Sequence, residues 1–118
     1  MTTDCVFCAI AAGEAPAVII REWDDTIAIL PSEDAEGRRG CTDGHILVIP
    51  RTHVRDFTEN PDVSAATARR VAQLARELGG QWNEITSAGP DATQTVFHQH
   101  RHLIPRHPRD GLALPWTA

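Results

Sequence analysis

The stretch Gln94-Thr-Val-Phe-His-Gln-His-Arg-His-Leu-Ile-Pro-Arg106 carries three histidines at strict two-residue spacing. Apolar residues flank the histidines on both sides, which predicts a core strand over residues 94–105. Side chains two positions apart on a strand share a face, so His98, His100 and His102 would form a row with intervals of about 6.5–7 Å. Imidazoles titrate near neutral pH and are costly to bury, so this row predicts a functional site.

The residues alone leave three interpretations of the histidine row open. Alternating histidines on a strand can chelate zinc. One imidazole could instead attack phosphorus while its neighbours handle protons and phosphoryl oxygens. A run of surface histidines is the third interpretation, and the apolar flanks disfavour it.

A second group of candidate ligands stands near the N-terminus. Cys5 and Cys8 are three residues apart in a chain of three cysteines, a spacing that favours half of a metal site over a disulfide. Tetrahedral zinc needs two further ligands, for which His53 and an end member of the histidine row are the candidates. Two small apolar residues on a helix are the alternative interpretation. Cys41, alone in a polar loop, is expected to be a free surface thiol.

Length, charge and hydrophobicity limit the kinds of protein that this chain can be. The 118 residues fit one compact domain over 1–118, and the net charge of −5 disfavours binding to nucleic acid. No apolar run approaches the roughly 20 residues that a membrane-spanning helix needs. The N-terminus lacks the pattern of a secretory signal, so a cytoplasmic protein is expected.

Periodicity and turn residues predict an α+β fold. The expected elements, in chain order, are a short helix over 4–12 with Asp4 as N-cap, hairpin strands over 17–22 and 26–30, a polar loop over 31–44, a buried strand over 45–50, a long helix from 61 to the glycines at 79–80, a strand over 84–88, a turn over 88–93 and the histidine strand over 94–105.

Three segments together resemble the histidine-triad (HIT) superfamily of nucleotide hydrolases and transferases, in its zinc-bearing bacterial form. Residues 94–106 resemble the signature H-φ-H-φ-H-φ-φ, in which φ is apolar, and Cys5-Val-Phe-Cys8 looks like the N-terminal zinc half-site. Residues 44–53, Gly-His-Ile-Leu-Val-Ile-Pro-Arg-Thr-His, are similar to the second conserved block. The resemblance implies a HIT-like fold, an antiparallel five-stranded sheet with one long helix and a short N-terminal helix, and a homodimer.

The resemblance also implies an activity on adenylated compounds, such as nucleoside phosphoramidates or dinucleoside polyphosphates. His100 would attack the α-phosphorus and form a nucleotidyl-histidine, which water then hydrolyses. His102 would stabilise the negative charge that develops, and His45 would hydrogen-bond the ring of the nucleophile or a neighbour.

The resemblance also implies which residues bind a metal ion and which contact the substrate. A structural Zn²⁺ would be held by Cys5, Cys8, His53 and His98, with no open position for water. Gln94 and Thr95 would donate to the phosphate of an AMP-type ligand, and Ser87 would contact the leaving group. Ser32, with Glu33 or Asp34, stands near the place where the family usually has an Asp or Asn that binds ribose.

Several residues depart from the family pattern. Gln99 and Arg101 replace apolar residues on the opposite face of the strand, where a buried Arg needs a partner. Either the sheet is thinner there, or both residues join a polar network or a subunit contact. The missing ribose ligand and the long 31–44 loop favour, as an alternative function, a nucleotide-binding regulatory module with little turnover. A hydrolase with a catalytic metal in the histidine row is a third possibility.

Overall fold

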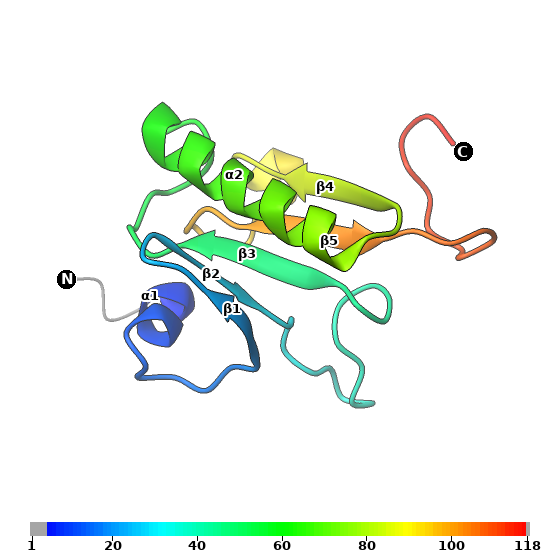
Figure 1. Ribbon diagram of the computed structural model, residues 1–118, viewed down its shortest axis with the longest axis horizontal. Coiled ribbons are helices and arrows are strands. Elements are labelled where there is room, and N and C mark those ends of the chain that lie inside the picture. Colours follow the sequence, from blue (N-terminus) through cyan, green and yellow to red (C-terminus); the bar gives the residue numbers. More distant parts are fainter. Residues whose placement is uncertain (1–4, 118) are drawn as a thin grey trace.

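A five-stranded antiparallel sheet with a helix on each face organises the computed structural model, which describes residues 5–117 (Figure 1). The spatial order of the strands is β1-β2-β3-β5-β4. Their bounds are Ile19–Glu22 for β1, Thr26–Ile29 for β2, Ile46–Pro50 for β3, Trp82–Thr86 for β4 and Arg101–Pro105 for β5. The helices are α1 (Val6–Ala11) and α2 (Pro61–Leu78), with a 3₁₀ turn η1 (Pro90–Ala92). This is the HIT-like α+β fold that the sequence predicts.

The two faces of the sheet carry separate apolar cores. Strands β2 and β3 are buried on both faces, as a continuous apolar run predicts for a central strand. Helix α1 contributes Phe7 and Ile10 to one core, together with Ile27 and Ile49 from the sheet. Helix α2 closes the other core, whose members are Ala28, Ile46, Val48, Val71, Leu74 and Leu103. Within the described residues, no helix is long and apolar enough to cross a membrane.

Both helices begin after a residue whose side chain accepts a hydrogen bond from a main-chain N–H of the first turn. The side chain of Asn60 accepts hydrogen bonds from two main-chain N–H groups at the start of α2, and Gly79 (φ +71°) ends the helix as predicted. Helix α1 is capped by Cys5, whose sulfur accepts from the N–H of Cys8 at 3.4 Å. The prediction of Asp4 as this N-cap is therefore wrong, and Asp4 itself lies outside the described residues.

The predicted histidine strand is shorter than expected. Strand β5 starts at Arg101, so among the three histidines only His102 lies in it. The chain leaves η1 through Thr93 in a left-handed conformation (φ +72°) and reaches the sheet as an irregular segment. Hydrogen bonds from Gln99 N–H to the Val54 carbonyl (2.7 Å) and from the Thr86 hydroxyl to the His100 carbonyl (2.9 Å) hold this segment in place. Strand β4 likewise lies two residues earlier than the predicted 84–88.

Side chains already alternate between the two faces of the sheet in the residues before β5. This alternation places Gln99 and Arg101, the two polar residues that depart from the family pattern, on the α2 side. Arg101 points to the α2 side, where its guanidinium contacts Glu84 at 2.8 Å, the Ser64 hydroxyl at 2.7 Å and the Gln99 Oε1 at 3.1 Å. The Gln99 side chain is fully buried. Of the alternatives for these residues, the structure shows the polar network.

We predict that Arg101→Ala lowers the free energy of unfolding by about 2–4 kcal/mol, because it leaves buried acceptors and a carboxylate without their cation. Urea denaturation measures this loss. The matched control is Arg38→Ala, because the Arg38 side chain is 72% exposed beside Asp34 and Glu36, and exposed ion pairs contribute only about 0–1 kcal/mol. Equal losses of unfolding free energy in the two variants would contradict a stabilising role for the Arg101 network.

Candidate functional site

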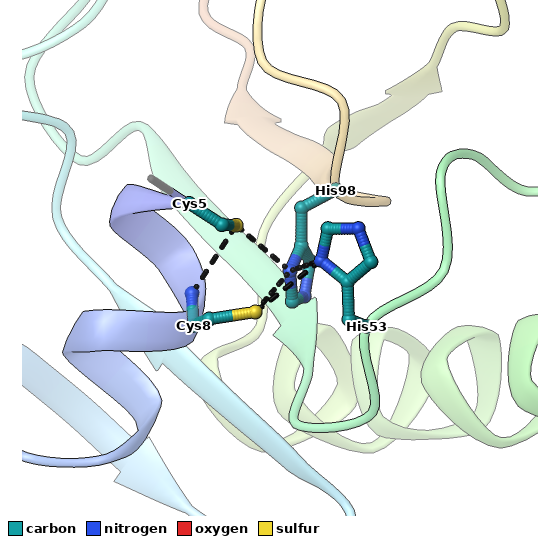
Figure 2. A group of neighbouring side chains, drawn as sticks. All are labelled: Cys5, Cys8, His53 and His98. Carbon is teal, nitrogen blue, oxygen red and sulfur yellow. Dashed lines mark hydrogen bonds between the residues drawn. The ribbon is translucent and has the colours of Figure 1, made fainter. Parts of the chain in front are cut away.

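Two cysteines and two histidines meet where α1 faces the sheet (Figure 2). Their ligand atoms all lie within 4.8 Å of one another. The Nδ1 atom of His98 is 3.4 Å from Cys5 Sγ, 3.5 Å from Cys8 Sγ and 3.2 Å from His53 Nδ1, and Cys8 Sγ is 3.2 Å from His53 Nδ1. Zinc bond lengths of about 2.0–2.3 Å imply tetrahedral edges of roughly 3.3–3.8 Å. The four donors that the resemblance implies thus come together with nearly the spacing of a zinc site.

Hydrogen bonding and burial suit this cluster to a cation. A carbonyl oxygen only accepts, so the contact of His98 Nε2 with the Pro50 carbonyl (2.7 Å) places the proton on Nε2 and leaves Nδ1 free as a ligand. Burial is the main cause of the lowered pKa of His98, which favours the neutral ligand form. Burial, a hydrogen bond with Cys5 and the charge of Cys5 raise the pKa of the Cys8 thiol to about 11, so without a cation the thiol stays protonated. A metal ion bound by the cluster would supply the positive charge that converts it to the thiolate.

His100 is held by the main chain of His98. Its Nδ1 lies 2.8 Å from the His98 carbonyl, to which it must donate, so the lone pair of His100 is on Nε2. The ring of Phe7 packs edge-on against both His98 and His100, with centroid distances of 5.8 and 5.2 Å. Neither the carbonyl nor Phe7 was among the expected site residues, because no pattern of side chains signals a main-chain acceptor.

His102 is paired with His45. The Nε2 of His45 is 3.0 Å from His102 Nδ1, and the rings of His100 and His102 lie 5.1 Å apart, less than the interval expected along a regular strand. Burial first, and then the charges of His100 and His45, lower the pKa of His102 to about 4. Burial also lowers the pKa of His45. His102 is therefore a neutral hydrogen-bonding group at physiological pH.

A cavity of about 640 Å³ opens in front of the rings of His100 and His102, and its size is typical of small-molecule sites. His100 and His102 form part of its wall, together with the predicted Ser32. Most of the remaining lining is apolar and comes from α1, the 16–18 segment and the end of β2. Glu33 and Arg39 add one carboxylate and one guanidinium, and Arg39 is a residue that the sequence did not single out.

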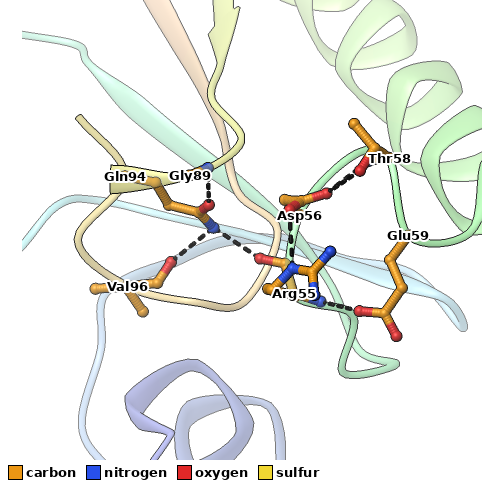
Figure 3. A network of polar contacts seen from close by, with 7 residues as sticks. All are labelled: Arg55, Asp56, Thr58, Glu59, Gly89, Gln94 and Val96. Atoms are coloured by element: carbon orange, nitrogen blue, oxygen red, sulfur yellow. Dashed lines mark hydrogen bonds and ion pairs between the residues drawn. The ribbon is translucent and has the colours of Figure 1, made fainter. Parts of the chain in front are cut away.

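The other three predicted substrate residues lie elsewhere. The Gln94 amide is fully engaged with the main chain, because it donates to the Arg55 and Val96 carbonyls (2.7 and 3.1 Å) and accepts from Gly89 N–H at 2.9 Å (Figure 3). Gln94 therefore orders the turn before the histidines, and a bond from its amide to phosphate would require one of these contacts to break. Thr95 and Ser87 are not among the residues that line the cavity.

Comparison with known proteins identifies the family of this chain. The HIT domain profile matches residues 12–109. An uncharacterized HIT-like protein of Mycobacterium tuberculosis is 42% identical over 113 residues, which are 91% of this chain and 73% of that protein. An adenylylsulfatase of Arabidopsis thaliana is 33% identical over 118 residues, which are 95% of this chain and 57% of that protein.

A solved structure extends the likeness to three dimensions. The Zn-bound histidine triad family protein of Mycobacterium smegmatis is 41% identical, with a TM-score of 0.74 over 93% of this chain and 80% of that one. The present chain belongs to the HIT domain family. The resemblance to its zinc-bearing bacterial members is confirmed.

We predict that the purified protein binds one Zn²⁺ per chain and that zinc raises its melting temperature by several degrees, because binding to the folded state alone stabilises it. Cys8→Ala should lose most of the metal and this increment. Cys41→Ala should keep both, because the exposed Cys41 is not part of the cluster. Metal analysis and thermal unfolding with and without a chelator give the comparison, and equal zinc content in the two variants would count against the site.

The lowered pKa of His102 has a consequence for stability. Between pH 4 and about 6.5 the unfolded chain binds a proton at this residue that the folded chain does not, so the free energy of unfolding should rise with pH across that window. His102→Gln should flatten the slope. An NMR titration of the folded protein checks the cause directly, and a His102 midpoint near 6.5 would refute it.

Proposed function

We propose that this HIT protein is a nucleotidyl hydrolase or transferase that cleaves adenylated compounds, such as nucleoside phosphoramidates or dinucleoside polyphosphates, with His100 as the nucleophile. One observation carries the proposal: His100 lines the 640 Å³ cavity, and its Nδ1 is bound to the His98 carbonyl, which leaves Nε2 as the nucleophilic atom. The adenylylsulfatase among the relatives supports the adenylated class of substrate.

The proposed reaction has two steps at phosphorus. His100 Nε2 forms a bond to the α-phosphorus, while the bond to the leaving group breaks and its electron pair departs with that group. The ring then carries a positive charge, which the Nδ1–H bond to the His98 carbonyl stabilises. Water next forms a bond to the same phosphorus, the bond between His100 Nε2 and phosphorus breaks with its electron pair returning to the ring, and the proton of water passes to the leaving group or to solvent. The products are the nucleoside monophosphate and neutral His100.

His102 would serve this reaction as a donor to phosphoryl oxygen. Its lowered pKa keeps it neutral, so it would stabilise developing charge by a fixed hydrogen bond and not by a full positive charge. The apolar wall from α1 and β2 suits a nucleobase, and Ser32 or Glu33, which also line the cavity, would meet the sugar. Thr95 and Ser87 stay predictions, because contacts with them would need the ligand to extend beyond the cavity lining.

The Cys5, Cys8, His53 and His98 cluster is proposed to hold a structural Zn²⁺. Four protein donors leave no open position for a reacting water, and His100 and His102 are not members of the cluster. This division disfavours the interpretation in which the histidine row itself holds a catalytic metal. A homodimer and a single domain over 1–118 remain predictions.

We predict that His100→Ala reduces hydrolysis of a fluorogenic adenosine 5′-phosphoramidate by at least about 1,000-fold, since the nucleophile is lost. Rapid quench at neutral pH should trap adenylate on the unsubstituted protein and none on the variant. His107→Ala is the matched control, because His107 is exposed and outside the cavity lining. Activity within tenfold of the parent in His100→Ala would exclude the proposed nucleophile.

The alternative function is a nucleotide-binding regulatory module with little turnover. The absence of a ribose-binding Asp or Asn at the end of β2 is the observation in its favour. Calorimetry separates the two functions, because a module would bind AMP at micromolar concentration while no adenylated compound is hydrolysed.

A further inference from the structure

The 31–44 loop ends against the ring of His45. The main-chain N–H of Cys41 donates to His45 Nδ1 at 3.1 Å. An atom that accepts a hydrogen bond from N–H carries no proton itself, so the proton of neutral His45 is on Nε2. The loop thus selects one tautomer of a buried histidine through its backbone.

The tautomer of His45 determines the tautomer of His102. His45 Nε2 is 3.0 Å from His102 Nδ1, and because Nε2 carries the proton, His102 Nδ1 must accept it. The remaining proton of neutral His102 is then on Nε2. A chain of two hydrogen bonds therefore makes His102 Nε2 a donor at the cavity that His102 lines.

Only glycine fits at the position that brings the loop to His45. Gly40 has φ +70°, and a Cβ added to it would stand 2.2 Å from His45 Nδ1 and 2.7 Å from His45 Cγ. Real Cβ atoms do not approach other atoms so closely, so any side chain at residue 40 would move either the loop or the ring. The close approach is what allows the Cys41 N–H to reach the imidazole.

The preceding residue holds the loop in this place. Arg39 donates to the Pro31 carbonyl at 3.0 Å and to the Glu33 carboxylate at 3.1 Å, and Glu33 and Arg39 form a β-bridge. Glu33 and Arg39 also line the cavity. The 31–44 loop therefore forms a wall of the cavity and also contacts His45, whose ring is hydrogen-bonded to His102.

We propose that Gly40 and the main-chain N–H of Cys41 are positioning groups, which fix the proton of His45 so that His102 presents Nε2–H to the substrate. The inference rests on the proposed function insofar as His102 acts on the phosphoryl group. The tautomers themselves do not depend on any activity.

Long-range ¹H–¹⁵N NMR of the histidine rings tests the proposal. In the unsubstituted protein we expect the Nε2–H tautomer at both His45 and His102. In Gly40→Ala we expect mixed tautomers, with kcat reduced on the order of 10- to 100-fold and KM changed much less, because the misplaced group acts on developing charge. Gly37→Ala is the control: Gly37 has φ +79° but no atom within 4 Å of an added Cβ, so it shares the backbone strain without touching His45.

Each outcome decides the matter. Nδ1–H at His45 or His102 in the unsubstituted protein overturns the proposal, whether or not Gly40→Ala folds. A folded Gly40→Ala with the same spectra and kcat as Gly37→Ala also overturns it. If the tautomers and their loss in Gly40→Ala are as expected but no adenylated compound is hydrolysed, the positioning role stands and the proposed function fails.

Discussion

His98 is the residue on which the rest of the site depends, because it makes three contacts with different parts of the chain. Its Nδ1 faces the two cysteines and His53, its Nε2 donates to the Pro50 carbonyl at the end of β3, and its carbonyl accepts from His100. The ring is completely buried. A buried imidazole is tolerated only when its polar atoms are engaged, so these contacts fix the backbone of the histidine segment.

That constraint divides the triad between two places in the structure. The ring of His98 belongs to the cluster beside α1, whereas His100 and His102 face the cavity. A second set of hydrogen bonds runs from His102 through His45 to the main-chain N–H of Cys41. His98, His100, His102 and His45 thus each have one nitrogen whose role a neighbour assigns, and each set ends at a main-chain group.

The parts of the fold that could be predicted are those with a strong local signal. The helix Pro61–Leu78, the buried strand after His45 and the Cys-x-x-Cys half-site all follow from periodicity, caps and ligand spacing. The extent of β5 could not be predicted, because it depends on two long-range hydrogen bonds, from the Gln99 N–H to the Val54 carbonyl and from the Thr86 hydroxyl to the His100 carbonyl. The tight contact of Gly40 was also invisible, since nothing in the sequence tells which ring a glycine approaches.

The alternation of faces around β5 has a consequence for how this sequence can vary. His100 and His102 belong to the cavity side, while Gln99, Arg101 and Leu103 belong to the α2 side. Among the described residues, the buried Gln99 Nε2 has no protein hydrogen-bond partner, a cost that an apolar residue of similar size would not carry. Substitutions at the odd positions therefore act on the packing against α2, whereas substitutions at the even positions act on the lining of the cavity, so each face of this segment can be altered without directly changing the other.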